Sequence, residues 1–97
     1  MQNTHFLTKA NDLYAKGEKT IKGSFFGNLS RSKADRQDEA KELFLQAANC
    51  FKLAQDPDQA LVCYEKCIEC EESEIDAAPH FREAANCIKD KDMNKYI

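Results

Sequence analysis

The chain has 97 residues, of which 42% are hydrophobic and 32% charged, and it carries three Gly, two Pro and a formal net charge of -3. This composition is typical of a single folded, helix-rich domain over residues 1–97 and excludes a disordered or fibrous chain. No run approaches the roughly 18 apolar residues that a membrane span needs, and residues 1–10 lack the basic start and apolar core of a signal peptide. We therefore expect a cytoplasmic protein, and the five cysteines agree because an odd number without a secretory signal suggests reduced thiols.

Charge is distributed unevenly along the chain. Residues 1–36 hold seven Lys and Arg against three acids, for a charge of +4, and residues 37–97 hold seven bases against fourteen acids, for -7. Nucleic-acid binding usually needs a basic face over the folded domain, so this distribution argues against it. It leaves an anionic membrane surface as a partner for the first third of the chain.

Apolar residues recur at helical spacing over two segments in the first half of the chain. Asn3 or Thr4 can cap a helix over 4–21, and the residues 22–34 that follow, with two glycines, three serines and an asparagine, are predicted to form a loop. The pattern returns over 35–55 and ends at Asp56, because the residue before Pro57 is disfavoured in the α region.

Two more helices are predicted in the second half, over 57–72 and 74–90. Pro57 suits the first turn of one, and Ser73 can cap the other. Because Pro79 lies inside the last helix, we expect a kink or a late start there. The residues of that helix expected to face inward are Ile75, Ala78, Phe81, Ala85 and Ile88.

A short repeat is the strongest internal signal. The segment QAANCFK at 46–52 returns as EAANCIK at 83–89, an offset of 37 residues. A repeat of that period predicts an all-α, tetratricopeptide-like solenoid of antiparallel helical hairpins, coiled into a right-handed superhelix. Residues 93–97 are expected to open a fifth helix, without a capping repeat to follow, so we expect the chain to be the N-terminal fragment of a longer protein.

The sequence offers little evidence for a catalytic, metal-binding or redox site. Cys67 and Cys70 form a C-x-x-C motif with Cys63 nearby, but no second close pair completes a zinc site and the motif falls within a helix, which favours buried small side chains over a metal or redox role. His80 lacks a nucleophile partner and is interpreted as a helix-surface histidine. No catalytic or phosphate-binding motif is present, so we predict no enzyme and no cofactor.

The segment GSFFGNLSRS, residues 23–32, places two adjacent phenylalanines in the predicted loop. Phe25 and Phe26 either fold back against the Ala40 and Phe44 face or project as an apolar wedge with Leu29. Bases flank them on both sides: Lys19, Lys22, Arg31 and Lys33. The residues alone leave both interpretations open.

Four features in this order resemble the soluble NSF-attachment proteins of the alpha and beta type: an amphipathic first helix, KGSFFGNLSRSK, DEAKELFLQAANCFKLAQ and EIDAAPHFREAANCIKDKD. The resemblance covers essentially the whole chain. It implies an adaptor in vesicle-mediated transport and membrane fusion, which binds assembled SNARE complexes of the syntaxin type and recruits the NSF ATPase for their disassembly. The part that engages NSF would lie beyond these residues.

The resemblance also implies roles for individual residues. It places Phe25 and Phe26 in a membrane-contact loop, together with Leu29, Lys22, Arg31 and Lys33, so that the cytoplasmic protein is peripheral on membranes. It places Lys52 and Lys89 near the concave surface that contacts the acidic SNARE bundle. Two alternatives remain: a generic tetratricopeptide-type module that binds a peptide, and a redox protein that depends on Cys67 and Cys70.

Overall fold

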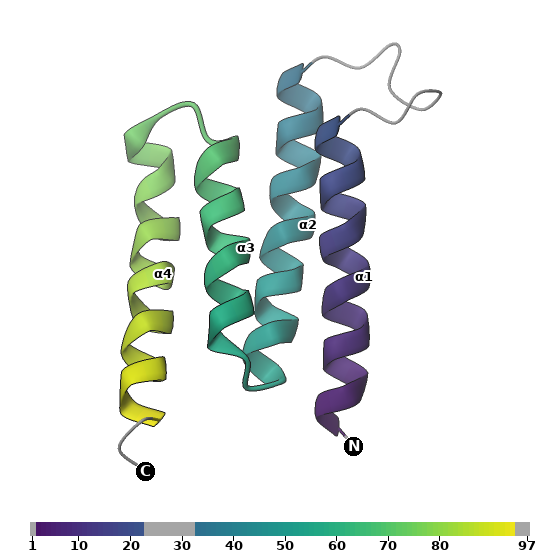
Figure 1. Ribbon diagram of the computed structural model, residues 1–97. Helices are drawn as coiled ribbons and strands as arrows, with labels where there is room; N and C mark the ends of the chain where they lie inside the picture. The colour runs from purple at the N-terminus through teal and green to yellow at the C-terminus, as the bar shows by residue number, and fades with distance from the viewer. Residues whose placement is uncertain (1, 23–32, 95–97) are drawn as a thin grey trace.

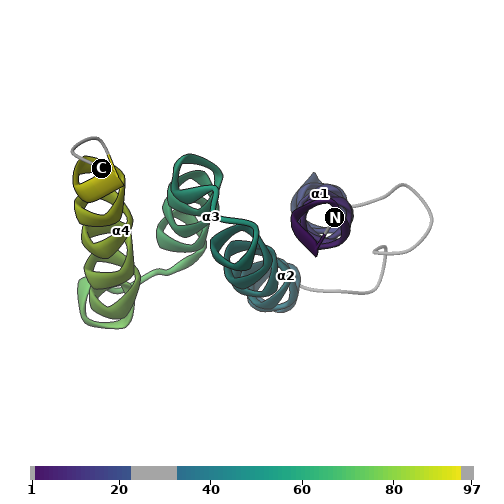
Figure 2. The ribbon, with the colours of Figure 1, turned by 90° about the horizontal axis from the view of Figure 1, so that it is seen from below.

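Four helices make up the computed structural model, which describes residues 2–22 and 33–94, with side chains described for 4–22 and 34–90. They are α1 (Gln2–Lys22), α2 (Lys33–Leu53), α3 (Pro57–Cys70) and α4 (Glu74–Asn94). Consecutive helices pack side by side and run antiparallel, and each contacts its neighbour in the chain (Figure 1). Viewed from below, α1 and α3 lie nearer one side of the array and α2 nearer the other, while α4 extends across its depth (Figure 2). The predicted all-α class is confirmed.

The helix ends differ from the predicted bounds by up to four residues, in both halves of the chain. Helix α3 ends at Cys70, two residues earlier than expected, and α4 continues to Asn94. Met93 and Asn94 therefore belong to α4 and do not open a fifth helix, while residues 95–97 lie outside the described part of the chain. Helix α4 begins at Glu74, the predicted start, and runs through Pro79, so of the kink or late start expected at this proline the late start does not occur.

The turn between α2 and α3 explains why the chain reverses at Asp56. Gln55 takes a left-handed backbone with φ of 62°, and the Asp56 N–H donates to the carbonyl of Phe51 at 2.9 Å, which closes the end of α2. The Asp56 carboxylate then accepts from the N–H of Gln59 at 3.3 Å, and Pro57 fills the first position of α3. One short segment thus ends one helix and begins the next.

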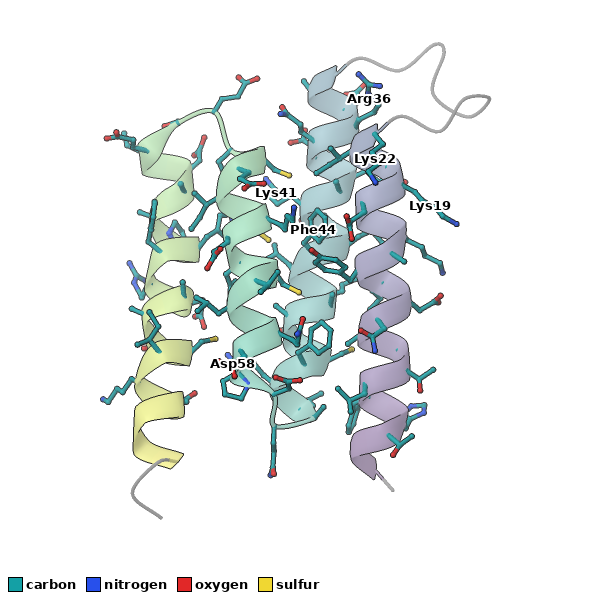
Figure 3. All side chains as sticks on the ribbon, viewed as in Figure 1. Lys19, Lys22, Arg36, Lys41, Phe44 and Asp58 are labelled. Atoms are coloured by element: carbon teal, nitrogen blue, oxygen red, sulfur yellow. The ribbon has the colours of Figure 1, made fainter. Side chains whose placement is uncertain are left out.

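Aromatic and small side chains fill the space between the helices. The rings of Tyr14 on α1 and Phe44 on α2 meet edge to face, with centroids 5.3 Å apart. Gly17 lies directly against the Phe44 ring, since a Cβ built at Gly17 would be 2.9 Å from it (Figure 3). Further along, fully buried alanines on α2 and α3 allow the helices to approach closely: Ala47, Ala48 and Ala60.

The face of α4 predicted to point inward is the wrong one. Ile75, Phe81 and Ile88 are 83%, 55% and 50% exposed, and Ala78 and Ala85 are exposed as well. The residues of α4 that are buried in the array are Ala77, His80, Ala84 and Cys87. Helix α4 thus carries two apolar stripes, and α3 covers the one with the smaller side chains because it permits the closer approach.

Candidate interaction surface

Lys52 joins α2 to α4 across the intervening helix α3. Its Nζ lies 3.4 Å from Oε2 of Glu83, and both side chains are about two-fifths exposed, at 40% and 41%. Burial acts against the charge on Lys52, but the neighbouring Tyr64 and Glu83 outweigh it and raise the pKa of the ammonium group. Burial in turn raises the pKa of Tyr64 on α3. The predicted partner-binding lysine is therefore already paired within the chain.

Lys89 occupies the position on α4 that matches Lys52 on α2. Both helices run in the same direction, so the two lysines lie toward the same end of the array (Figure 1). Lys89 is exposed, whereas Lys52 points toward α4 and Glu83. The two predicted partner-binding residues thus sit at equivalent places on successive repeats.

A second polar link was not predicted from the sequence. Glu71, directly after α3, accepts a hydrogen bond from Lys41 on α2 at 3.3 Å, and its other oxygen lies 2.8 Å from Nε2 of His80 on α4. The side chains of Glu71 and His80 are only 11% and 9% exposed. Burial alone raises the pKa of Glu71, but hydrogen bonds from His80 and Lys41 outweigh it and lower the pKa below its ordinary value.

His80 is therefore buried, and its interpretation as a surface histidine was wrong. A signal for this existed in the repeat, because the offset of 37 residues matches His80 to Leu43, an apolar and partly buried residue of α2. A polar residue at such a position needs a buried partner, and Glu71 supplies it. The contact between Glu71 and His80 was not predictable in the same way, because no sequence motif relates these two residues.

The two polar links lie along the same side of α2. Lys41 and Lys52 are eleven residues apart, which is close to three full turns and about 16 Å along the helix. On α4, His80 and Glu83 are three residues apart and also share a face. The links therefore join α4 to α2 at two levels of α2 and at nearly one level of α4, and of the two only the Lys52–Glu83 pair is substantially exposed.

Basic side chains gather where α1 ends and α2 begins. Lys19 and Lys22 are exposed in the last turn of α1, and Arg36 is half-buried near the start of α2 (Figure 3). Nε of Arg36 is buried and has no hydrogen-bond partner within the described residues. Lys33 is the first residue of α2. The other predicted membrane-contact residues lie outside the described part of the chain: Phe25, Phe26, Leu29 and Arg31.

All five cysteines are buried and unpaired, which confirms the interpretation of them as core side chains. Burial raises the pKa of the Cys63 and Cys67 thiols to about 12. Within residues 2–22 and 33–94, no three metal-binding side chains are close enough to hold an ion. In the same residues, no helix is both long and apolar enough to cross a bilayer.

Antiparallel helices, a repeated motif on α2 and α4 and polar links between those helices define a helical-hairpin repeat protein, a class that works by binding other proteins. The chain belongs to the soluble NSF attachment protein family. The model that describes this family, "Soluble NSF attachment protein, SNAP", matches residues 8–97. Comparison with curated proteins and with solved structures gave no match. The family resemblance inferred from the sequence is confirmed.

Proposed function

We propose that this protein is an adaptor that binds assembled SNARE complexes and brings them to the NSF ATPase for disassembly. The observation that carries the proposal is the family match over residues 8–97, nearly the whole chain. The family consists of adaptors that catalyse no covalent chemistry, and the array of helices offers extended helix faces to a partner protein. The protein would work in the cytoplasm, peripheral on membranes.

Lys52 and Lys89 are the proposed contacts to the acidic SNARE bundle. They occupy matching places on two parallel helices, so they present charge at a regular spacing to an elongated partner. The ion pair between Lys52 and Glu83 does not prevent this, because both side chains are two-fifths exposed and such pairs are worth about 0.2 to 1 kcal/mol. Lys52 can therefore leave Glu83 and pair with an acid of the partner at little cost in free energy.

A pull-down on an assembled SNARE complex tests these contacts. Lys52→Ala with Lys89→Ala should weaken capture several-fold, and the loss should diminish at high salt because the contacts are electrostatic. Lys9→Ala, which removes an exposed lysine from α1, is the matched control and should leave capture unchanged. Equal capture by all variants would remove the proposed role of the two lysines. Binding to a free C-terminal peptide in place of the SNARE complex would favour a generic tetratricopeptide-type module.

The Phe-Phe loop is proposed to contact the membrane. Tyr14 and Gly17 of α1 already pack against Phe44, which is fully buried, so the alternative site for the loop aromatics against α2 is filled from another helix. Exposed Lys19 and Lys22 stand at the base of the loop and would face anionic headgroups. Burial of each phenylalanine contributes about 1.5 to 3 kcal/mol, which predicts a reversible anchor.

Co-sedimentation with vesicles of phosphatidylcholine and phosphatidylserine tests the loop. Phe25→Ser with Phe26→Ser should abolish sedimentation while the helical circular dichroism stays the same. Leu53→Ser, which removes an exposed apolar side chain at the opposite end of α2, should sediment as the unmodified protein does. If the double variant sediments with the vesicles as the unmodified protein does, the two phenylalanines do not contact the membrane and instead pack within the protein.

A further inference from the structure

The Lys52 side chain does not stand free for a partner, because Glu83 of α4 already pairs with it. Nζ of Lys52 and Oε2 of Glu83 are 3.4 Å apart, and they come from helices that lie on either side of α3 (Figure 1). Both side chains are partly exposed, so a partner can reach each of them. All three helices that form this site belong to the described residues. The candidate contact is thus occupied by an acid of the same chain.

The surroundings of Lys52 favour its charged form before any partner binds. Tyr64 of α3, which is 3% exposed, neighbours the lysine between the two outer helices. Burial acts to lower the pKa of Lys52, but Tyr64 and Glu83 act to raise it and prevail. An acid of a partner must therefore replace the contribution of Glu83 to make the same contact.

A carboxylate on a partner competes with Glu83 at a disadvantage. Glu83 is part of the same chain, so its effective concentration near Lys52 is high and does not depend on the partner. An exposed pair of this kind changes an equilibrium by up to about fivefold. Once displaced, the Glu83 carboxylate also faces the acids of the partner, and like charges side by side weaken binding.

The repeat contains an uncharged counterpart of Glu83. At the offset of 37 residues, Glu83 matches Gln46 of α2, which is exposed. Both copies of the motif continue with the same four residues, Ala-Ala-Asn-Cys, and both are helical. The helix therefore forms with either residue at this position, and the consequence of the acid lies in its pair with Lys52.

We propose that Glu83 is an internal competitor for Lys52, which a carboxylate of the partner must displace before this lysine contributes to binding. The inference rests on the proposed adaptor function, because it names the residue that regulates one of the proposed contacts. Displacement exchanges one ion pair for another at this point. It suits a partner with a row of acids, which makes further contacts elsewhere and so recovers the loss.

Competitive acetylation measures the pair without a partner. Only the uncharged amine reacts, and loss of the Glu83 charge lowers the pKa of Lys52, so Glu83→Gln should raise the acetylation rate of Lys52 about two- to fivefold. The rate is measured by mass spectrometry relative to Lys9, an exposed lysine of α1. Glu65→Gln, which removes an exposed acid from α3, is the matched control and should leave the ratio unchanged. An unchanged ratio in Glu83→Gln would overturn the proposal.

Titration of an assembled SNARE complex measures the competition itself. At about 0.15 M salt, Glu83→Gln should lower the Kd about two- to fivefold, and Glu65→Gln should change it by less than about 1.5-fold. In a chain that also carries Lys52→Ala, the change at Glu83 should have a clearly smaller effect, because only the repulsion between acids is then removed. Circular dichroism should show the same helix content in every variant.

The outcomes separate this proposal from the adaptor function on which it rests. If no variant binds the SNARE complex, the adaptor function is refuted. If the complex binds with the same Kd before and after Glu83→Gln, that function stands and the role of Glu83 is refuted. An equal gain with and without Lys52 also refutes it, since Glu83 would then act only through its general charge. A gain that depends on Lys52 supports the proposal.

Discussion

Removal of the Glu71 carboxylate should destabilise the fold more than removal of any nearby surface acid. Glu71→Ala deletes the group that joins Lys41 on α2 to His80 on α4. His80 is left with a buried nitrogen that has lost its partner, which costs about 1 to 3 kcal/mol. Loss of the Lys41 contact costs less. The Lys41 side chain is 23% exposed, so water and the carboxylate of Asp38, 4.0 Å away, still interact with its ammonium group.

The net expectation for Glu71→Ala is a loss of about 2 kcal/mol in the free energy of unfolding, because the loss at His80 dominates and relief from burying a carboxylate offsets part of it. For a domain of this size, each kcal/mol shifts the melting temperature by about 4 to 8 °C, so a drop of roughly 8 to 16 °C follows. Urea unfolding followed by circular dichroism measures the free energy directly. Glu72→Ala, at the exposed neighbouring residue, is the control and should change it by about 0.5 kcal/mol or less.

The difference in unfolding free energy between Glu71→Ala and the unmodified protein should disappear in acid. Burial acts to raise the pKa of Glu71, but the hydrogen bonds from His80 and Lys41 leave it below the ordinary value. A carboxylate whose pKa is lower in the folded state contributes stability above its unfolded pKa of about 4.3, and loses it as the pH falls through the folded value. The difference between the unmodified protein and Glu71→Ala should therefore be full near pH 7 and shrink below about pH 4. A difference of 0.5 kcal/mol or less at pH 7, or one that persists unchanged into acid, would refute this account of the link.

Two further expectations concern the core. Gly17→Val should destabilise the protein by about 1 to 3 kcal/mol in urea unfolding, because even a Cβ there would stand 2.9 Å from the Phe44 ring. The control Ala15→Val, on the exposed face of α1, should cost about 0.5 kcal/mol. Equal losses for the two variants would contradict the close contact between Gly17 and Phe44. Because burial raises the pKa of the Cys63 and Cys67 thiols to about 12, a colorimetric disulfide reagent at pH 8 should modify them at the rate of unfolding; fast modification of the native protein would show that the core opens locally.

Helical periodicity predicted the first three helices well and the orientation of the fourth badly, for one physical reason. Helix α2 packs against α1 on one side and α3 on the other, so its apolar residues such as Phe44 and Ala47 are buried whichever neighbour they face. Helix α4 has apolar residues on two faces, and no pattern within a helix tells which face receives a neighbour. The larger side chains suggested the wrong choice, since close approach to α3 selected Ala77 and Ala84 instead.

The repeat predicted the positions of two candidate residues but not their role. Lys52 and Lys89 match in successive copies of the motif and lie at equivalent positions in the structure, whereas their binding role is implied by the family resemblance and stays a prediction. The link through Glu71 joins residues up to thirty positions apart in the sequence, and neither spacing nor composition marks it. The roles of Phe25 and Phe26 stay predictions, because those residues lie outside the described part of the chain.

The two polar links between α2 and α4 also determine how the array would carry a load. A pull along α4 reaches α2 through Lys52 at one level and through Glu71 at the other, without passing through the apolar contacts of α3 alone. Lys41 and Lys52 are about 16 Å apart along α2, but His80 and Glu83 are only three residues, about 4.5 Å, apart along α4, so both paths start from nearly one level of α4. When Lys52 exchanges Glu83 for an acid of a partner, the path through the buried Glu71 remains as the polar connection between the two helices.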